Sequence, residues 1–313
     1  MAFNSDNLTS YVELKSKEIA SKAVGGAKTA ALLIQNGAVQ TGIKTQAPVL
    51  QMNTDIVLQD GSSCGRLASG STKLSNKMLV VKPIKSNENL CPKDLYGKYY
   101  AWALKAGQDP ESEGYDNAFV QAILDQTVEG VASENEKMLW QGDTSLSGST
   151  NLKRIDGLLK QIIAGSYIDI SNSGADIIAK LQQAYLKMPV EVRNKPDFRL
   201  FIGEDTYDEY ITALANKNIF KSTDDITLFG SRAKLEPIPG LNGTNTIVAA
   251  RISNLQLGLD LEGDADKVSF KYSQETEQWY KDVHYVLGIV PIYVEEIGYY
   301  HISPTTTTTT TLG

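Results

Sequence analysis

Apolar residues recur with two different periods along the first 140 residues of the chain. Near the N-terminus their spacing is close to the 3.6 residues of a helical turn, at Leu8, Val12, Ile19 and Ala23. We therefore expect a helical N-terminal arm over residues 7–35, which the Gly25-Gly26 pair interrupts.

The period then changes to two residues. Alternating positions follow in two runs: Leu50, Met52, Thr54, Ile56 and Leu58, then Met78, Val80, Lys82 and Ile84. The polar, glycine-rich segment 60–76 separates the runs, so the pattern predicts a long β-hairpin with a flexible tip. Because a two-stranded ribbon is marginally stable in water, we expect it to lie on its own domain or on another subunit.

A helical period returns between Asp116, a candidate N-cap, and Trp140. One face carries the apolar residues Phe119, Val120, Ile123, Leu124, Val128 and Val131. The other carries most of the acidic residues, namely Asp125, Glu129, Glu134 and Glu136. Such a helix is roughly 37 Å long, which suggests a structural strut. We expect it to end at a glycine stop, Gly142, with Trp140 folded back onto the core.

The second half mixes helices and strands without the regular alternation of a doubly wound sheet, so the predicted fold class is α+β. Residues 171–173 offer caps for a helix that Pro189 ends, and Asp205 opens another helix. Strands are expected over residues 198–202, 246–250, 255–261, 268–272, 279–290 and 292–300. The last segment, residues 304–313, contains seven consecutive threonines and is expected to be a flexible tail.

Composition narrows the classes of function. A chain of 313 residues can bury the core of one large domain or of two connected ones. With a net charge of −7 and a pI of about 5.1, we expect no basic stripe that would hold a nucleic-acid backbone. Two cysteines are too few for a disulfide framework, and neither a secretory signal nor a membrane-spanning apolar run is present. We expect a soluble protein made in a reducing cytosol.

Residues able to support catalysis are few. Both histidines, His284 and His301, fall in predicted strands, where packed or surface roles are the commoner ones. Cys64, in the GSSCG stretch, falls in the hairpin tip and has no rigid support there. The GLNGTN stretch at residues 240–245 fits a turn better than a phosphate-binding loop. A hydrolase that uses Cys64 or Cys91 with His284 remains the enzyme alternative.

Metal-binding patterns are equally sparse. The acidic residues Glu262, Asp264 and Asp266 lack the other ligands of a calcium loop and fit a solvated turn better. Glu295 and Glu296 are expected on opposite sides of one strand, so they do not form a carboxylate pair. The sequence therefore predicts no catalytic, cofactor or metal site.

The order of these elements resembles the major capsid proteins of tailed bacteriophages with the Hong Kong 97 fold. A helical arm and a long hairpin precede an extended helix that closes on ENEKMLWQGD, and a serine-rich loop leads to IDGLLKQI. The residues that match the family's pattern are Trp140, Gly142, Asp143, Gly157 and Leu158. The second half is similar too, through IIAKLQQAYLKMP and FRLFIGEDTYDEYITAL.

The resemblance implies a division of the chain. It makes residues 1–46 an N-terminal arm, 47–86 the extended hairpin loop, 116–140 a spine helix, 87–169 and 266–303 a peripheral domain, 170–265 an axial domain and 304–313 a flexible tail. It implies a virion protein, synthesised in the cytoplasm of a bacterial host, that assembles through hexamers and pentamers into an icosahedral shell around double-stranded DNA. The implied partners are other copies of the chain, portal and decoration proteins and non-specifically contacted DNA, without a membrane.

Two departures from the family qualify this interpretation. Only about 46 residues precede the hairpin, which implies a separate scaffolding protein or none. Lys73 and Lys77 sit where some members carry a crosslinking lysine, although hairpin lysines are usually just solvated. The nearest alternative is an encapsulin-type bacterial compartment that encloses enzyme cargo. A tail-tube or adhesin subunit is disfavoured by the long central helix.

Overall fold

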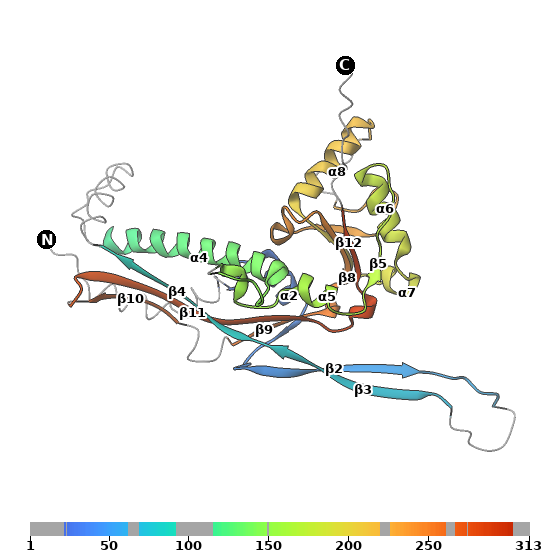
Figure 1. The fold of residues 1–313 in the computed structure, drawn as a ribbon, viewed down its shortest axis with the longest axis horizontal. Coiled ribbons are helices and arrows are strands. Elements are labelled where there is room, and N and C mark those ends of the chain that lie inside the picture. Colours follow the sequence, from blue (N-terminus) through green and yellow to red (C-terminus); the bar gives the residue numbers. More distant parts are fainter. Residues whose placement is uncertain are drawn as a thin grey trace.

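A computed structural model shows two five-stranded sheets, the helices packed on them, and a two-stranded ribbon that leaves the body (Figure 1). The α+β class is therefore confirmed. The structure describes residues 22, 24–61, 69–91, 115–148, 150–219, 226–260, 267–273 and 275–302. The description excludes the side chains of residues 115–120, 267, 270 and 272. Cys64, the acidic residues at 262, 264 and 266, and the threonine-rich tail lie outside it.

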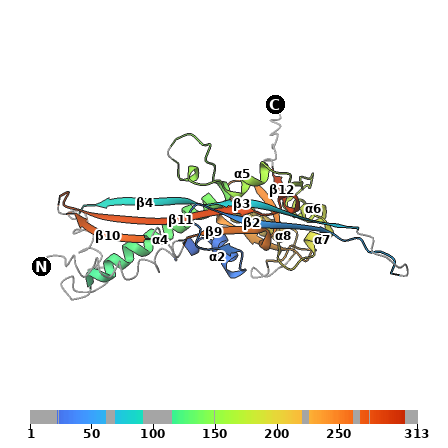
Figure 2. The ribbon, with the colours of Figure 1, turned by 90° about the horizontal axis from the view of Figure 1, so that it is seen from below.

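The first sheet is built around one 14-residue strand, β11 (Gln278–Pro291). β10 (Lys267–Ser273) and β9 (Leu255–Leu259) pair with successive parts of one of its edges. β4 (Lys82–Leu90) pairs antiparallel with the other edge, and the two-residue β1 (Val39–Gln40) extends the sheet beyond β9. Figure 2 shows these strands side by side along the long axis of the molecule.

The second sheet has the order β5-β12-β8-β6-β7. Its strands are β5 (Ile168–Asp169), β6 (Phe198–Ile202), β7 (Lys234–Pro237), β8 (Thr246–Arg251) and β12 (Gly298–His301). The helices α6 (Ile177–Lys187), α7 (Val190–Arg193) and α8 (Glu204–Asn216) share one buried hydrophobic core with this sheet. A separate core lies between the first sheet and the long helix and extends to the second sheet through Phe201, Val248 and Ala250.

The sheets do not follow the boundaries predicted at residues 170 and 265. β9 lies inside that segment and yet belongs to the first sheet, whereas β12 lies outside it and belongs to the second. The chain passes between the sheets three times, after α5 (Leu158–Ile163), through η3 (Ile252–Asn254) and through η4 (Val294–Glu296). Both sheets are therefore assembled from distant parts of the sequence.

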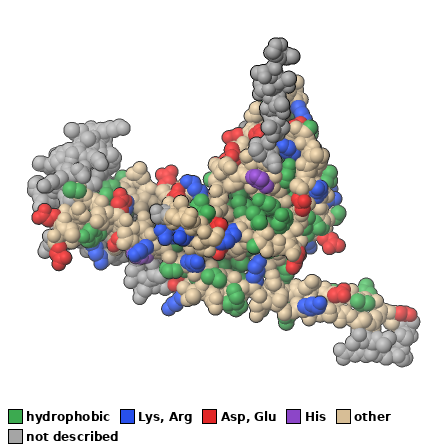
Figure 3. All heavy atoms as spheres, viewed as in Figure 1, with side chains coloured by type: hydrophobic (Ala, Val, Ile, Leu, Met, Phe, Trp, Pro, Cys, Tyr) green, Lys and Arg blue, Asp and Glu red, His purple; other side chains and the backbone are tan. Residues whose placement is uncertain are grey.

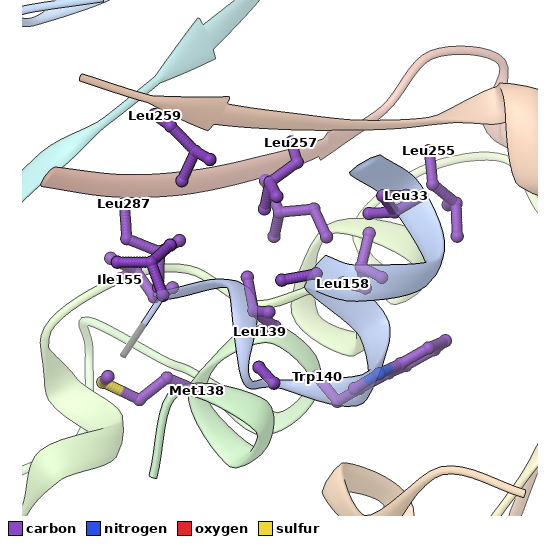
Figure 4. Packing of buried hydrophobic residues seen from close by; sticks show 14 of the residues in the cluster. Leu33, Met138, Leu139, Trp140, Ile155, Leu158, Leu255, Leu257, Leu259 and Leu287 are labelled. Carbon is purple, nitrogen blue, oxygen red and sulfur yellow. The ribbon is translucent and has the colours of Figure 1, made fainter. Parts of the chain in front are cut away.

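The predicted strut is α4 (Tyr115–Gln141), a helix of 27 residues that lies over the first sheet (Figure 1). It already includes Asp116, so this residue does not cap it. The side chains of Leu124, Met138, Leu139 and Trp140 are buried, which confirms that Trp140 folds back onto the core. Figure 4 shows the end of α4 meeting side chains from β9, β11 and α2 (Lys28–Gln35).

Glu136, expected on the face of the long helix opposite the apolar residues, is buried. Only 2% of Glu136 is exposed, because its carboxylate faces the N-terminus of α2, where Ala27 provides no side-chain cap. The Thr29 amide donates to Glu136 Oε2 (2.8 Å) and the Thr29 hydroxyl donates to Oε1 (2.5 Å). The Trp140 indole N–H in turn donates to Thr29 Oγ1 (2.7 Å). A distant carboxylate thus supplies the anion that a helix N-terminus favours, and it joins α4 to α2.

Gly142 ends α4 for a reason other than the expected glycine stop. Its φ is not positive; instead, the Gly157 amide donates to its carbonyl (2.8 Å), and the two backbones pass in contact. A Cβ on Gly142 would lie 2.5 Å from the carbonyl oxygens of both Ile155 and Met138, closer than real Cβ contacts allow. Glycine is therefore required here by close packing of backbone against backbone.

Most other expected elements are confirmed, with local differences. The predicted strands at 198–202, 246–250, 268–272 and 279–290 correspond to β6, β8, β10 and β11. The cap of α6 is Asp176, whose carboxylate accepts from the Ala179 amide (2.8 Å), rather than residues 171–173. Glu295 and Glu296 lie in the short helix η4 and not in a strand, because a backbone turn separates β11 from β12.

The crowding at Gly142 and the open space at Gly130 predict that substitution by alanine has opposite effects on stability at the two positions. We expect Gly142→Ala to lower the free energy of unfolding by about 2 kcal/mol or more, because the added methyl group meets backbone that cannot move aside. Gly130, in the middle of α4, has open space around it, so Gly130→Ala should raise stability by up to about 1 kcal/mol. Chemical denaturation of both variants tests this, and equal effects would contradict it.

Burial raises the pKa of the Glu136 carboxyl above its ordinary value of 4.5, although the hydrogen bonds from Thr29 oppose that shift. The folded protein therefore retains a proton that the unfolded chain releases, and this carboxyl lowers stability as the pH rises from 4.5 through the raised pKa. We expect the stability of Glu136→Gln relative to wild type to increase over that window and then stay constant. Denaturation curves at several pH values measure it, with the exposed Glu129→Gln as control. A pH-independent difference for Glu136→Gln would refute the assignment.

Candidate assembly surface

The hairpin that the alternating pattern predicted is present, with different bounds. Residues 71–76, expected in its tip, belong to its second strand, whereas Lys82 and Ile84, expected in that strand, belong to β4 of the first sheet. β2 (Gln46–Asp55) and β3 (Ser71–Val80) pair antiparallel at all ten positions, from Gln46 opposite Val80 to Asp55 opposite Ser71. Neither strand pairs with a third strand among the described residues. In Figure 3 the hairpin extends beyond the body as a narrow arm, with hydrophobic side chains visible on it.

One face of this hairpin is apolar and uncovered. Side chains alternate across a strand, so a shared face is formed by the even-numbered residues of β2 and their partners in β3. We call it the apolar face after its apolar residues Pro48, Leu50, Met52, Leu74, Met78 and Val80, beside which lie the polar residues Gln46, Thr54, Thr72 and Asn76. Leu50 is 72% exposed and Leu74 71%, and Met52 and Met78 are 62% and 43% exposed. Beyond β2, Ile56, Val57 and Leu58 are exposed as well.

The opposite face has its buried apolar packing at the root of the hairpin. There Leu79 is fully buried and joins a small core with Ile43, Val81, Val286 and Val290. Toward the tip this face becomes polar, with Gln51, Asn53, Lys73 and Ser75. The ribbon is therefore amphipathic, and the side that its own body leaves uncovered is the apolar one.

Two glycines let the root cross the first sheet closely. Gly258 of β9 and Gly288 of β11 are register partners. A Cβ on Gly288 would lie 2.3 Å from the Val80 carbonyl oxygen, and one on Gly258 would lie 2.7 Å from Val81 Cγ1. Any side chain at these positions would push the hairpin away from the sheet.

Farther along, the hairpin is held by the turn that follows β11. The Tyr293 hydroxyl lies 2.9 Å from the Met52 amide and 3.2 Å from the Met52 carbonyl oxygen. The Gln51 side chain donates to the Ile292 carbonyl. Burial lowers the pKa of the Lys77 ammonium, and nearby Glu295 opposes that shift. No sequence pattern singled out Tyr293, because a lone tyrosine after a strand carries no distinctive signal.

The residues that matched the family pattern come together, but not on this surface. Trp140 and Leu158 are fully buried, and Gly142 contacts Gly157. Asp143 forms an ion pair with Lys160 (2.6 Å), and this contact, together with Ser145, lowers the pKa of the Asp143 carboxyl to about 2. These residues close α4 onto the loop that follows it, so their role is to hold the body together.

A groove of about 740 Å³ separates α4 from β4 and β11. Several of its polar side chains bind neighbouring side chains rather than pointing at a common empty position, as the polar groups of a ligand site do. Lys281 pairs with Glu88 and donates to Thr127 Oγ1 (2.8 Å), and the Tyr285 hydroxyl donates to Asn135 (2.6 Å). We assign no ligand to this groove.

The candidate catalytic residues are not brought together. His284 is opposite Lys85 in the sheet, which places it about 20 Å along the strand from Cys91. His301 lies in the second sheet, and Cys64 falls outside the described residues. No group of three or more His, Cys, Asp or Glu side chains suited to a metal ion occurs in the described part of the chain.

The other expected features have mixed outcomes. Lys73 is exposed on the hairpin and Lys77 is half-buried, and crosslinking through either stays a prediction. Residues 240–245 form the turn that was expected, with positive φ at Gly243 and Asn245. None of the described helices has the length and apolarity needed to span a membrane.

The chain matches solved structures that are distant from it in sequence. No protein-family model and no curated protein matches the chain. The satellite phage P4 procapsid that includes the size-determination protein matches with a TM-score of 0.60 at 10% identity, over 94% of this chain and 90% of that one. The capsid of an empty GTA particle matches with a TM-score of 0.56 at 13% identity, over 88% of this chain and 90% of that one.

Shells of a second kind match as well. The holo-SrpI encapsulin complex from Synechococcus elongatus has a TM-score of 0.52 at 12% identity, over 88% of this chain and 92% of that one. Because these likenesses extend over nearly the whole of each chain, they show the architecture, although identities this low show the fold alone. The chain has the Hong Kong 97-type fold that these capsid and encapsulin structures share.

Proposed function

We propose that this chain is the major capsid protein of a tailed bacteriophage. In this function it assembles with its own copies, through hexamers and pentamers, into an icosahedral shell that encloses double-stranded DNA. The observation that carries the proposal is the apolar face of the hairpin, which the described body leaves uncovered on a fold shared with shell-forming proteins. A second copy of the chain is the occupant that would bury it.

The size of the apolar face suits assembly from weak contacts. Complete burial of a Leu, Met or Val side chain contributes about 1.5–3 kcal/mol, so covering five partly exposed ones contributes about 5–10 kcal/mol. Association costs about 4–15 kcal/mol in lost freedom of motion. One hairpin contact therefore barely holds two subunits together, whereas a closed ring, in which each subunit gives one hairpin and receives another, is stable. Weak single contacts also allow misplaced subunits to leave.

The two sheets suggest how the chain divides into the two domains of a shell subunit. We propose that the first sheet with α4 forms the peripheral domain, and that the second sheet with α6, α7 and α8 forms the axial domain around the ring axes. Portal and decoration proteins are further proposed partners, and assembly uses either a separate scaffolding protein or none. The net negative charge of the chain suits a container that contacts its DNA without sequence preference and releases it.

An encapsulin-type compartment is the second candidate, because the encapsulin structure above has the same fold. The contents of purified particles distinguish the two functions, since a compartment encloses protein and a phage capsid encloses DNA. The cysteine hydrolase has no comparable support, because Cys91 and His284 lie far apart along the sheet.

Polar substitutions on the apolar face test the proposal. We expect the double variant Leu50→Ser, Leu74→Ser to fold with a melting temperature near that of wild type, because both side chains are mostly exposed in the single subunit. The same variant should lose particle formation, because it removes much of the apolar area that a neighbour would bury. Negative-stain electron microscopy and light scattering measure assembly.

A matched control lies on the opposite face of the same hairpin. Asn53→Ser with Lys73→Ser changes the cross-strand pair next to Met52 and Leu74, on the polar side, and should leave assembly intact. Normal particles from the Leu50, Leu74 variant would reject the proposal. A loss of particles in both double variants would indicate a general need for the hairpin rather than for its apolar face.

A further inference from the structure

A single tyrosine hydroxyl holds the backbone of the hairpin far from its root. Both the amide and the carbonyl of Met52 bind the Tyr293 hydroxyl, so both groups must face away from the partner strand β3. This orientation belongs to the widely spaced positions of an antiparallel pair. A hydroxyl can donate one hydrogen bond and also accept, so Tyr293 satisfies both groups of an open strand edge at once.

Tyr293 is itself fixed by a buried side chain of the body. The Asn254 amide group donates to the Tyr293 carbonyl (2.7 Å), and its oxygen accepts from the Tyr293 amide (2.6 Å). Asn254 is 2% exposed and lies in η3, where the chain passes from the second sheet to the first. A continuous line of hydrogen bonds therefore runs from the junction of the two sheets, through Tyr293, to the hairpin.

The distance of the Tyr293–Met52 contact from the root lets it fix the direction of the hairpin relative to the body. Met52 is six residues beyond the start of β2, which corresponds to about 20 Å along the strand. A displacement of about 1 Å at that distance turns the hairpin by about 3°, so a hydrogen-bonded contact there fixes its angle closely. The packing of Leu79 at the root fixes where the hairpin starts, but it lies closer to that start and so restricts the angle of the hairpin less than the Met52 contact does.

We propose that Tyr293 is a positioning residue that sets the angle of the hairpin to the body and thereby the curvature of the shell. This inference rests on the proposed assembly function, because the hairpin is the part that reaches the neighbouring subunit. A hairpin held within a narrow range of angles places each neighbour within a narrow range of inclinations. Without the hydroxyl, the hairpin remains attached at its root but occupies a range of angles.

We call the pair of hydrogen bonds between the Tyr293 hydroxyl and Met52 the Tyr293 clamp. Amide hydrogen exchange in unassembled subunits tests this clamp directly. In Tyr293→Phe the Met52 amide loses its partner, and we expect it to exchange at least about tenfold faster than in wild type. The control is Tyr300→Phe in β12 of the second sheet, which removes another hydroxyl that donates to a backbone carbonyl, that of Asn172 (3.1 Å). This control should leave Met52 exchange unchanged. Equal exchange at Met52 in wild type and Tyr293→Phe would overturn the clamp.

Particle size tests the consequence for curvature. We expect Tyr293→Phe to retain the wild-type melting temperature but to form particles with a broader distribution of diameters, whereas Tyr300→Phe forms particles like those of wild type. An unchanged distribution from Tyr293→Phe would overturn the control of curvature. If wild-type subunits formed no particles, the proposed function and the curvature step would both fail, and the exchange experiment would still decide the clamp.

Discussion

A two-stranded ribbon cannot bury an apolar face against itself, and the assembly we propose for this protein follows from that constraint. The pairing of β2 with β3 satisfies the inner backbone edges of the ribbon but leaves its side chains on two open faces. The body covers one face at the root, where Leu79 is buried, and leaves Leu50 and Leu74 on the other face exposed. An apolar face of this kind on a folded protein indicates an interaction surface.

The rest of the molecule holds this ribbon in a defined place. β11 runs through the first sheet and continues into the turn that carries Tyr293, so one segment links the body to the hairpin. α4 is fixed over the same sheet by the contact of Gly142 with Gly157 and by the buried Glu136 at the start of α2. A rigid body matters for assembly because closure of a ring requires each subunit to present its contacts at constant angles.

The local patterns of the sequence predicted the elements well, and what they missed depends on contacts between distant residues. The two-residue alternation gave the hairpin, and the helical period gave α4, because both depend on neighbouring residues. The same period placed Glu136 on the face opposite the apolar residues, and nothing near it in the sequence shows that it is buried. Its burial depends on hydrogen bonds that Thr29, 107 residues away, donates to its carboxylate. Gly142 had the right position for the end of a helix but a different reason, set by Ile155 and Gly157. Tyr293 and Met52 are 241 residues apart in the sequence, so no local pattern indicates their contact.

The burial of the apolar face on assembly is the central claim, and methionine oxidation measures it most directly. Met52 and Met78 are exposed on that face, whereas Met138 and Met188 are each 2% exposed in the body and serve as internal controls. With a mild oxidant and mass spectrometry, we predict that Met52 and Met78 oxidise rapidly in free subunits and become protected in assembled particles, while the two controls stay protected throughout. Equally rapid oxidation of Met52 and Met78 in particles and in free subunits would contradict the account.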